Sequence, residues 1–254
     1  MPWNPDVYNQ FKAERYAPFY DLLNLIKPTI GMEIIDLGCG TGELTRKLAD
    51  ALPASHTTGI DSSEEMLEKA AAFAREGVHF ELQTIEETLS TSDKYDLVFS
   101  NAALQWIPDH KELMQQIIYL LKSNGQLAIQ VPSNHNHHSH MAIRATAEKE
   151  PFRSALKGWN RISPVLSIEE YAQIFFDNGG HDITVFEKVY PHVLENARAV
   201  VEWTSGTALV PYMEKLPEDL RNAFLAEYTS ILEKSMPGSP VLYPFKRTLM
   251  TAIF

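Results

Sequence analysis

The sequence contains a single cysteine, Cys39, among 254 residues. One cysteine cannot form a disulfide within the chain or supply the several thiolates of a cysteine-based metal site. No uncharged apolar run reaches about 18 residues, the length that a membrane-spanning helix needs. Residues 1–17 carry four charged side chains instead of the apolar core of a secretion signal. These absences lead us to expect a protein of the reducing cytoplasm, with no membrane partner.

Positive charge is also scarce. The 22 Lys and Arg residues stand against 33 Asp and Glu residues, which gives a net charge of -11, and no run of five or six like charges occurs. A surface that follows nucleic-acid phosphates needs concentrated positive charge, so nucleic acid is not an expected partner. The hydrophobic content of 44% is that of an ordinary globular chain with a full core.

Short apolar runs alternate with longer amphipathic segments between about residues 32 and 132. This alternation is typical of a parallel sheet whose strands are joined by helices. The predicted strands are 32–37, 56–61, 78–82, 95–100 and 126–131, and the predicted helices are 41–52, 63–75 and 111–122.

The alternation of apolar runs and amphipathic segments stops after Pro132, because residues 133–164 are polar, histidine-rich and irregular. We therefore expect an α/β fold with one doubly wound, mostly parallel, seven-stranded Rossmann-like sheet and helical cap insertions. Further predicted elements are a helix at 167–178, a strand at 182–189, two or three helices in 197–236 broken at Pro211 and Pro217, and a strand at 248–254. We expect a single domain, 1–254, with a core of about 31–132, 165–190 and 247–254 and cap segments of about 1–30, 133–164 and 191–246.

A glycine-rich turn, Gly38-Cys39-Gly40-Thr41-Gly42, directly follows the first predicted strand. Open α/β sheets bind ligands at this position. The spacing G-x-G-x-G differs from the dinucleotide pattern G-x-G-x-x-G, which disfavours a nicotinamide-dependent dehydrogenase, and no Lys-Ser/Thr follows, which excludes a P-loop. The simpler alternative is that these glycines only make a tight turn. Cys39 is then either a small packed residue or a nucleophile.

Two acidic residues accompany this turn. Asp36 lies just before it, and Asp61 ends the second predicted strand. An acidic turn repels a pyrophosphate but accommodates an ammonium group, and an acid after the second strand can accept hydrogen bonds from a ribose diol. Because S-adenosylmethionine offers both groups, we predict it as the cofactor.

Three ordered motifs occur along the chain: Asp36-Leu37-Gly38-Cys39-Gly40-Thr41-Gly42, Gly59-Ile60-Asp61-Ser62-Ser63 with Met66-Leu67, and Asn101-Ala102-Ala103-Leu104-Gln105-Trp106. They resemble the motifs of the class I S-adenosylmethionine-dependent methyltransferases, which implies their Rossmann-like fold.

A narrower resemblance rests on further segments: Trp3-Asn4-Pro5 with Tyr8, Phe11, Glu14 and Arg15, then 104–110 and 130–132. These segments resemble the trans-aconitate 2-methyltransferases within that family. Weaker similarity continues through His140, Arg144, Tyr190, Trp203 and Arg247, so the resemblance covers most of the chain.

The resemblance implies a set of cofactor contacts. Two glycines would lie against the methionine part, an acid would hold the ribose hydroxyls, a methionine would pack on adenine, and one backbone would close the sulfonium side. The two glycines are Gly38 and Gly40, the acid is Asp61, the methionine is Met66 and the backbone is that of Asn101. Asp36 and Ser62 belong to the same predicted site.

Two parts of the predicted cofactor site depart from the pattern or stay open. The family often has an acid beside the adenine amino group, where this chain has Thr84 and Ile85. Thr84 accepts a hydrogen bond without a charge, so adenine contact there would rest on backbone and Ile85. Arg15, on a predicted N-terminal helix, binds a carboxylate of the cofactor or of the substrate, or is a solvated surface residue.

The expected substrate is a small organic acid, with trans-aconitate as the first candidate. A carboxylate is already ionised at neutral pH, so its methylation needs no general base, and the sequence shows no Ser-His-Asp or paired-carboxylate arrangement. The segment after the fourth strand lacks the Asn-Pro-Pro-Tyr run of amide and adenine methyltransferases. Trp106 follows that strand and either donates its indole N–H to the reacting carboxylate or packs the cap.

Four histidines lie within residues 135–140. No matching acid or cysteine cluster accompanies them, so we predict no metal site. His140 and Arg144, four residues apart on one helix face, are instead predicted to orient the substrate as anion donors. Arg161 and Arg247 are further candidates, each with the alternative of being an ordinary surface arginine.

Val210 weakens the assignment to trans-aconitate. Related chains carry Gly-Leu-Arg-Pro where this sequence has Ala-Leu-Val-Pro, and valine cannot pair with a carboxylate of a polyacid. A more apolar acid, a carrier-bound malonyl group, and a cofactor-binding protein without catalysis therefore remain alternatives. We expect a monomer or a weak oligomer.

Overall fold

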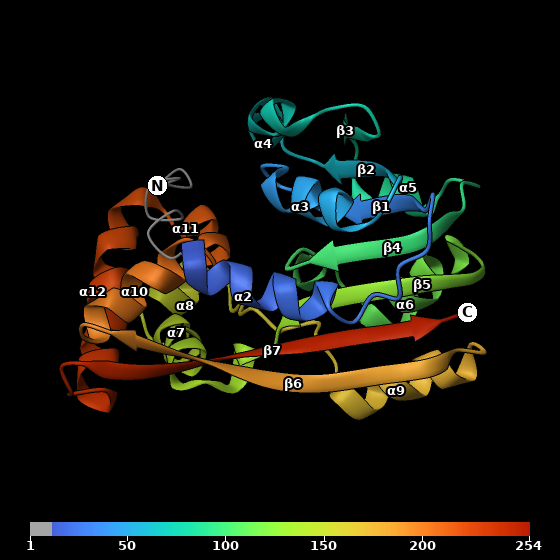
Figure 1. Ribbon diagram of the computed structural model, residues 1–254. Helices are drawn as coiled ribbons and strands as arrows, with labels where there is room; N and C mark the ends of the chain where they lie inside the picture. The colour runs from blue at the N-terminus through green and yellow to red at the C-terminus, as the bar shows by residue number, and fades with distance from the viewer. Residues whose placement is uncertain (1–11) are drawn as a thin grey trace. The chain divides into compact units, whose positions relative to one another are not determined.

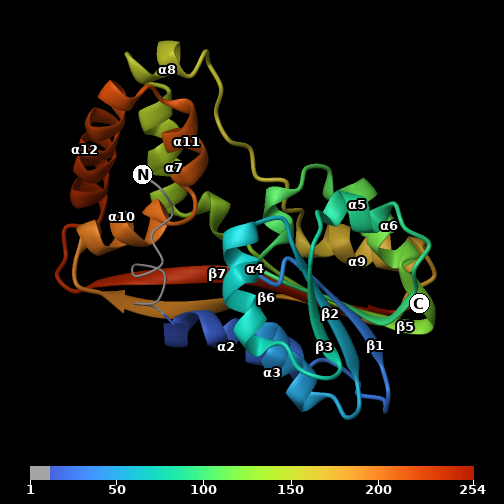
Figure 2. The ribbon, with the colours of Figure 1, turned by 90° about the horizontal axis from the view of Figure 1, so that it is seen from above.

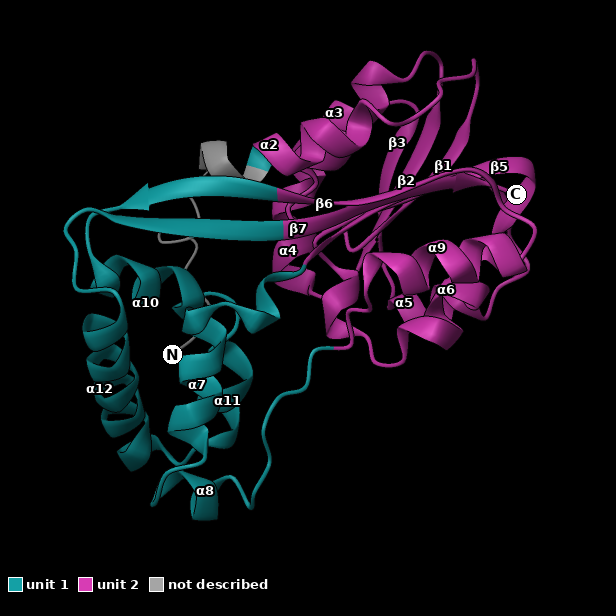
Figure 3. Cartoon of the chain, turned by 90° about the horizontal axis from the view of Figure 1, so that it is seen from below, with its two compact units in different colours: residues 1–16, 133–163, 189–246 teal, residues 17–132, 164–188, 247–254 magenta. Residues whose placement is uncertain are grey.

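The computed structural model describes residues 12–254, with only the backbone described for 12–15. The chain separates into two compact units, which are treated one by one (Figure 3). Of the described residues, unit 1 comprises 12–16, 133–163 and 189–246, and unit 2 comprises 17–132, 164–188 and 247–254. Among the described helices, none combines the length and the apolar character that a bilayer span requires.

The sheet has seven strands in the order β3-β2-β1-β4-β5-β7-β6 (Figure 1). The pairs β2–β3, β1–β2, β1–β4 and β4–β5 are parallel, whereas β7 runs antiparallel to β5. This order confirms the predicted class I methyltransferase fold. The strands are β1 Glu33–Leu37, β2 His56–Asp61, β3 Val78–Leu82, β4 Tyr95–Asn101, β5 Leu121–Pro132, β6 His181–Leu194 and β7 Val241–Ile253.

Helices of unit 2 cover both faces of its part of the sheet (Figures 1 and 2). On one face, helices α2 (Lys12–Leu23) and α3 (Glu43–Ala51) bury Phe19, Leu22 and Leu48 against the central strands. On the other face, α6 (His110–Tyr119) and α9 (Ile168–Asp177) pack on a second apolar cluster. Because both faces are covered, the central strands bury apolar side chains on both of their faces, among them Ile34 and Ile35 of β1 and Val98 and Phe99 of β4. Two shorter helices, α4 (Glu64–Ala70) and α5 (Ile85–Leu89), follow β2 and β3.

Three predicted boundaries are wrong because a strand is longer than its predicted range. The predicted helix 111–122 ends at Tyr119, because strand β5 begins at Leu121 and pairs there with Tyr95. Strands β6 and β7 are likewise several residues longer than the apolar runs that predicted them. Strand pairing is a contact between distant segments, so a pattern read along the chain underestimates its extent.

Unit 1 is helical around an aromatic core. Its helices are α7 (His138–Ala147), α8 (Phe152–Ala155), α10 (Ala197–Ser205), α11 (Val210–Lys215) and α12 (Glu218–Ser235). Tyr212 stacks on Phe224 with ring centroids 5.8 Å apart, and both side chains are buried. The prediction of two or three helices in 197–236 is confirmed: Pro211 lies in the first turn of α11, and Pro217 immediately precedes α12.

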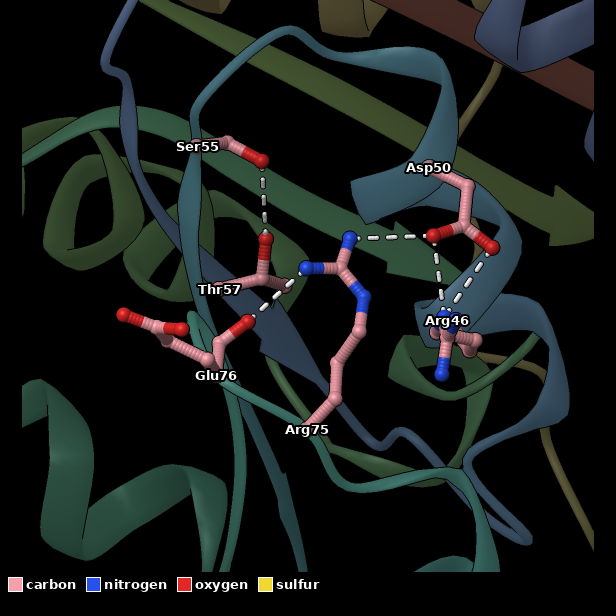
Figure 4. Close-up of polar contacts among 6 residues, drawn as sticks. All are labelled: Arg46, Asp50, Ser55, Thr57, Arg75 and Glu76. Atoms are coloured by element: carbon pink, nitrogen blue, oxygen red, sulfur yellow. Dashed lines mark hydrogen bonds and ion pairs between the residues drawn. The ribbon is translucent and has the colours of Figure 1, made fainter.

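An exposed ion-pair network joins α3 to the loop before β3 (Figure 4). Asp50 accepts hydrogen bonds from Arg46 Nε at 2.9 and 3.0 Å and from Arg75 NH2 at 2.9 Å. Although slight burial acts in the opposite direction, these two guanidinium groups lower the pKa of Asp50. Exposed pairs of this kind are worth about 0–1 kcal/mol, so the network orients the loop more than it stabilises the fold.

Candidate active site

The glycine turn is shaped by close packing at its ends and by open space at its centre. Gly38, Gly40 and Gly42 all have positive φ, at +80°, +55° and +75°. A Cβ at Gly38 would lie 2.3 Å from the Ala103 side chain, and one at Gly42 would lie 2.7 Å from Phe80, so neither position tolerates a side chain. A Cβ at Gly40 would meet no atom within 4 Å. The backbone of Gly40 therefore borders room for a ligand.

Asp61 is held beside this turn by two backbone groups. Its Oδ2 accepts the Gly40 N–H at 2.9 Å, and its Oδ1 accepts the Ser63 N–H at 3.0 Å. Each carboxylate oxygen has two lone pairs, so both oxygens keep capacity for further donors. The carboxylate is partly exposed. Its orientation is thus fixed by the backbone while it can still accept hydrogen bonds from two hydroxyls.

Neighbouring positions on the β2 side complete this edge. Ser63 begins α4 by accepting the Met66 N–H at 3.3 Å, which leaves Met66 partly exposed in the first turn and Ser62 exposed before it. After β3, Thr84 caps α5: its hydroxyl accepts the Glu87 N–H at 3.1 Å. Ile85 is buried in the core of unit 2. The Thr84 hydroxyl and the Ile85 side chain therefore both have structural roles, and adenine contact by them stays a prediction.

Asp36 is a buried carboxyl behind the glycine turn. It is only 3% exposed, and its Oδ2 accepts the Thr45 hydroxyl at 2.6 Å. Burial is the main cause that raises the pKa of Asp36 to about 7; the Thr45 hydrogen bond opposes this increase, and the charge of Asp61 adds to it. Burial, followed by the charges of Asp36 and Asp61, also raises the pKa of the Cys39 thiol. Cys39 is therefore a packed thiol and not an activated nucleophile.

The turn after β4 places Trp106 at the same strand edge. The Ala102 N–H donates to the Gln130 carbonyl at 2.9 Å, and Ala102 has a positive φ of 59°. Trp106 follows in the 3₁₀ turn η2 (Leu104–Trp106) with 47% of its surface exposed. Asn101, the last residue of β4, is partly exposed. Trp106 is thus partly accessible at this edge, and its donation to a ligand stays a prediction.

A buried histidine fixes this turn. Burial is the main cause that lowers the pKa of His110, so the imidazole is neutral. Its Nε2 lies 3.0 Å from the Leu104 carbonyl, which only accepts, so Nε2 donates and Nδ1 accepts from the Tyr171 hydroxyl. Tyr171 in turn accepts the Leu166 N–H at 3.3 Å. This chain of hydrogen bonds ties the start of η2 to α9.

Unit 1 contains a separate cluster of cationic and polar side chains, here named the arginine cluster: His140, Arg144, Asn160, Arg161 and Tyr212. The Tyr212 hydroxyl donates to Asn160 Oδ1 at 2.5 Å and accepts the Arg161 N–H at 3.1 Å. The Asn160 amide donates to the Arg144 carbonyl at 3.1 Å. These bonds connect α7, the loop after α8 and α11.

His140 is a buried, neutral member of this cluster. Burial is the main cause that lowers the pKa of His140 to about 3, and the neighbouring His137, Arg161 and Arg144 contribute to this decrease. His140 is therefore neutral at physiological pH, and its Nδ1 bonds to the Ser139 hydroxyl at 3.1 Å. His140 is thus not a cation, and the orientation of the substrate by His140 and Arg144 stays a prediction.

Other predicted residues fall elsewhere or outside the description. Arg247 lies in unit 2, buried, with its NH1 donating to Gln130 Oε1 at 3.1 Å. The side chain of Arg15 lies outside the described residues. Within the described part of the chain, no group of three or more His, Cys, Asp or Glu residues is arranged to hold a metal ion.

Residues 28–179 match the family described as a methyltransferase domain. This chain belongs to the methyltransferase family. It is 44% identical to the trans-aconitate 2-methyltransferase of Deinococcus radiodurans over 99% of this chain and 98% of that protein. It is 34% identical to the protein of that name from Mycobacterium tuberculosis, over 98% of this chain and 96% of that protein.

Solved structures share the fold of this methyltransferase. The YcgJ protein of Bacillus subtilis has a TM-score of 0.58 at 16% identity, over 94% of this chain and 98% of that one. Phosphoethanolamine N-methyltransferase 2 of Haemonchus contortus, solved with S-adenosylhomocysteine and phosphomonomethylethanolamine, has a TM-score of 0.55 at 18% identity, over 94% of this chain and 52% of that one.

The methyltransferase uses S-adenosylmethionine, and the residues present fit this cofactor. Gly40 borders the open space that a ligand needs, and Asp61 presents a fixed carboxylate with lone pairs to spare. The acidic pair Asp36 and Asp61 suits the ammonium group of the cofactor. The individual contacts to Gly38, Met66 and Asn101 remain predictions.

Asp36 gives the cofactor-free methyltransferase a pH-dependent stability. Its pKa is about 7 in the folded state and near 4 in the unfolded state. A raised carboxyl pKa stabilises the fold most below the unfolded value, and this contribution is lost as the pH rises through the folded value. We expect the free energy of unfolding, measured by urea titration, to fall by about 3 kcal/mol between pH 5 and pH 8 relative to Asp36→Asn. Parallel pH profiles for the two proteins would contradict the assignment.

Sequence reasoning missed several residues that shape the methyltransferase site. Thr45, His110 and Tyr171 hold Asp36 and the η2 turn in place. Tyr212 and Asn160 organise the arginine cluster. Only His110 could have been found from the sequence, because it lies inside the segment 104–110 that carried the resemblance. No sequence pattern pointed to the other four residues.

Proposed function

We propose that this chain transfers the methyl group of S-adenosylmethionine to one carboxylate of trans-aconitate, giving the monomethyl ester and S-adenosylhomocysteine. The proposal is carried by the near-full-length similarity to trans-aconitate 2-methyltransferases, which reaches 44% identity. The positive arginine cluster supports it independently, because an acid with three carboxylates needs cationic partners.

The cofactor supplies an electrophilic methyl group on a sulfonium, and the protein has to present a carboxylate oxygen in line with it. Carboxylates are ionised at neutral pH, so no residue has to remove a proton. Catalysis then consists of orienting and desolvating the acid. Trp106 is the proposed donor to the reacting carboxylate, and His110 holds the turn from which its indole extends.

The arginine cluster of unit 1 is proposed to bind carboxylate groups of the acid. Arg144 and Arg161 carry the positive charge of the cluster. Burial is the main cause that lowers the pKa of Arg161. Arginine suits this task because its planar fork binds a carboxylate through two parallel hydrogen bonds. His140 contributes as a neutral ring and not as a cation.

Val210 bears on which acid the protein accepts. It is partly buried at the start of α11, two residues before Tyr212. A cation is absent from that position, so unit 1 depends on Arg144 and Arg161 for charge near Tyr212. A more apolar or carrier-bound acid is the competing substrate.

We further propose that unit 2 is the methyltransferase core and unit 1 the cap of a single working domain. The single cysteine suits the cytoplasm as its place of action. We propose a monomer or weak oligomer that acts on a small molecule and on neither nucleic acid nor membranes. Light scattering at two protein concentrations tests the oligomeric state.

A panel of acids tests the substrate assignment. The purified protein is supplied with S-adenosylmethionine and with trans-aconitate, cis-aconitate, citrate, isocitrate or a long-chain monocarboxylic acid, and kcat/KM is measured for each. We expect the largest kcat/KM with trans-aconitate and the smallest with the monocarboxylic acid. The reverse order would replace the polyacid by an apolar acid, and S-adenosylmethionine binding without turnover of any acid would favour a binding-only protein.

A further inference from the structure

Two buried glutamines lie on the same face of strand β5, four residues apart, and differ in how their amides are used. The Gln126 amide is fully engaged within the fold. Its Nε2 donates to the Leu25 carbonyl at 3.2 Å and to the Thr251 hydroxyl at 2.6 Å, and its Oε1 accepts the Lys27 N–H at 3.0 Å. Both donors and the acceptor of Gln126 therefore serve the structure.

The Gln130 amide has donors to spare. Its Oε1 accepts from Arg247 NH1 at 3.1 Å. Because a guanidinium group only donates, the amide oxygen must face Arg247 and the Nε2 must face away from it. Gln130 is wholly buried, yet its Nε2 has no hydrogen-bond partner among the residues that the structure describes. Buried donors without partners are costly and mark a ligand or an ordered water.

Asn101 extends this arrangement across the sheet. It is paired in register with Gln130, so the two side chains lie on the same face of neighbouring strands. The Asn101 Oδ1 is also buried and has no partner within the described chain. Asn101, Gln130 and Arg247, here named the polar row, all belong to unit 2 and lie at the carboxyl ends of β4 and β5 or beside them. Parallel α/β sheets bind ligands at this edge.

We propose that the polar row binds a carboxylate, with Gln130 Nε2 and Arg247 as the donors. A carboxylate accepts from an amide N–H and from a guanidinium at the same time. The Asn101 amide can rotate to present its own N–H groups to the same ligand. The bound carboxylate has two possible sources, the acid substrate and the amino-acid end of the cofactor. In naming these two molecules the inference rests on the proposed function.

Gln130→Met tests the proposal, with Gln126→Met as its matched control. Methionine keeps the length of the side chain and removes the amide. Calorimetry measures binding of S-adenosylhomocysteine, of 5′-methylthioadenosine, which lacks the amino-acid end, and of trans-aconitate in the presence of S-adenosylhomocysteine. We expect Gln130→Met to weaken one of the two carboxylate probes by about 10- to 100-fold and to leave 5′-methylthioadenosine unchanged. Gln126→Met should lower the melting temperature more but leave all three affinities unchanged.

The outcomes separate the two sources and the simpler explanation. Weakened S-adenosylhomocysteine assigns the polar row to the cofactor carboxylate, and weakened trans-aconitate alone assigns it to the substrate. The proposal is overturned if Gln130→Met binds, with unchanged affinity, every carboxylate probe that the wild type binds. The Gln130 donors would then bond only to water. Gln130→Glu is the second variant, because its carboxylate pairs with Arg247 and repels a ligand carboxylate. Binding is measured without turnover, so failure to form an ester overturns the proposed function and leaves this inference standing.

Discussion

Replacing Asp61 by alanine is expected to weaken S-adenosylhomocysteine binding by about 100-fold or more. The variant removes a charged acceptor for two ribose hydroxyls, and each hydrogen bond to a charged group is worth about 1.5–3 kcal/mol. It also releases the Gly40 N–H, which Asp61 now holds at 2.9 Å beside the open centre of the glycine turn. Calorimetric titration measures the change.

Asp96→Ala is the matched control for this prediction. Asp96 also accepts a backbone N–H, that of Glu33 at 2.8 Å, and pairs with Lys122, but it takes no part in the glycine turn. We expect Asp96→Ala to lower stability slightly and to bind S-adenosylhomocysteine as the wild type does. Equal affinity of Asp61→Ala and the wild type would refute the ribose assignment and, with it, the location of the cofactor.

Replacing Arg161 by methionine is expected to raise KM for trans-aconitate by about 10- to 100-fold with little change in S-adenosylhomocysteine affinity. The change removes a partly buried charge that acts, like that of Arg144, on Tyr212 and His140, where a carboxylate is proposed to bind. Hydrogen bonds between charged partners give the range. Steady-state kinetics at saturating cofactor measure it.

Two comparisons show whether the Arg161 effect is specific. Arg153→Met, in the same unit, removes an exposed guanidinium whose distance to the Glu148 carboxylate is 3.9 Å, and it should leave KM unchanged. Combining Arg144→Met with Arg161→Met should give a non-additive increase, because the two side chains belong to one cluster. An unchanged KM in both arginine variants would mean that the arginine cluster binds some other group or serves structure alone.

The parallel part of the fold was predictable because its signals are local. Each strand from β1 to β4 is a short segment bounded by turn residues, and the structure places these segments where the pattern does. Strands β6 and β7 run well beyond their apolar segments, because pairing extends them. The start of β5 at Leu121 was missed for the same reason, since its partner there, Tyr95, is 26 residues away.

The site divides in a similar way. Gly40 and Asp61 were identifiable because ligand binding at a strand-to-helix turn imposes local residue types, and the structure joins them by a hydrogen bond. Gln130 and Arg247 are 117 residues apart and meet only through the pairing of β5 with β7. The neutral state of His140 follows from burial, which the sequence does not reveal.

The most direct test of the account is the identity of the methylated atom. The protein is incubated with trans-aconitate and S-adenosylmethionine whose methyl carbon is ¹³C, and the product is analysed by NMR and mass spectrometry. The account predicts one added methyl group per molecule, with the chemical shift of a methyl ester, and loss of that group in mild base. A methyl group on carbon, nitrogen or a hydroxyl oxygen, or an unmodified acid beside a protein that binds the cofactor, would contradict it.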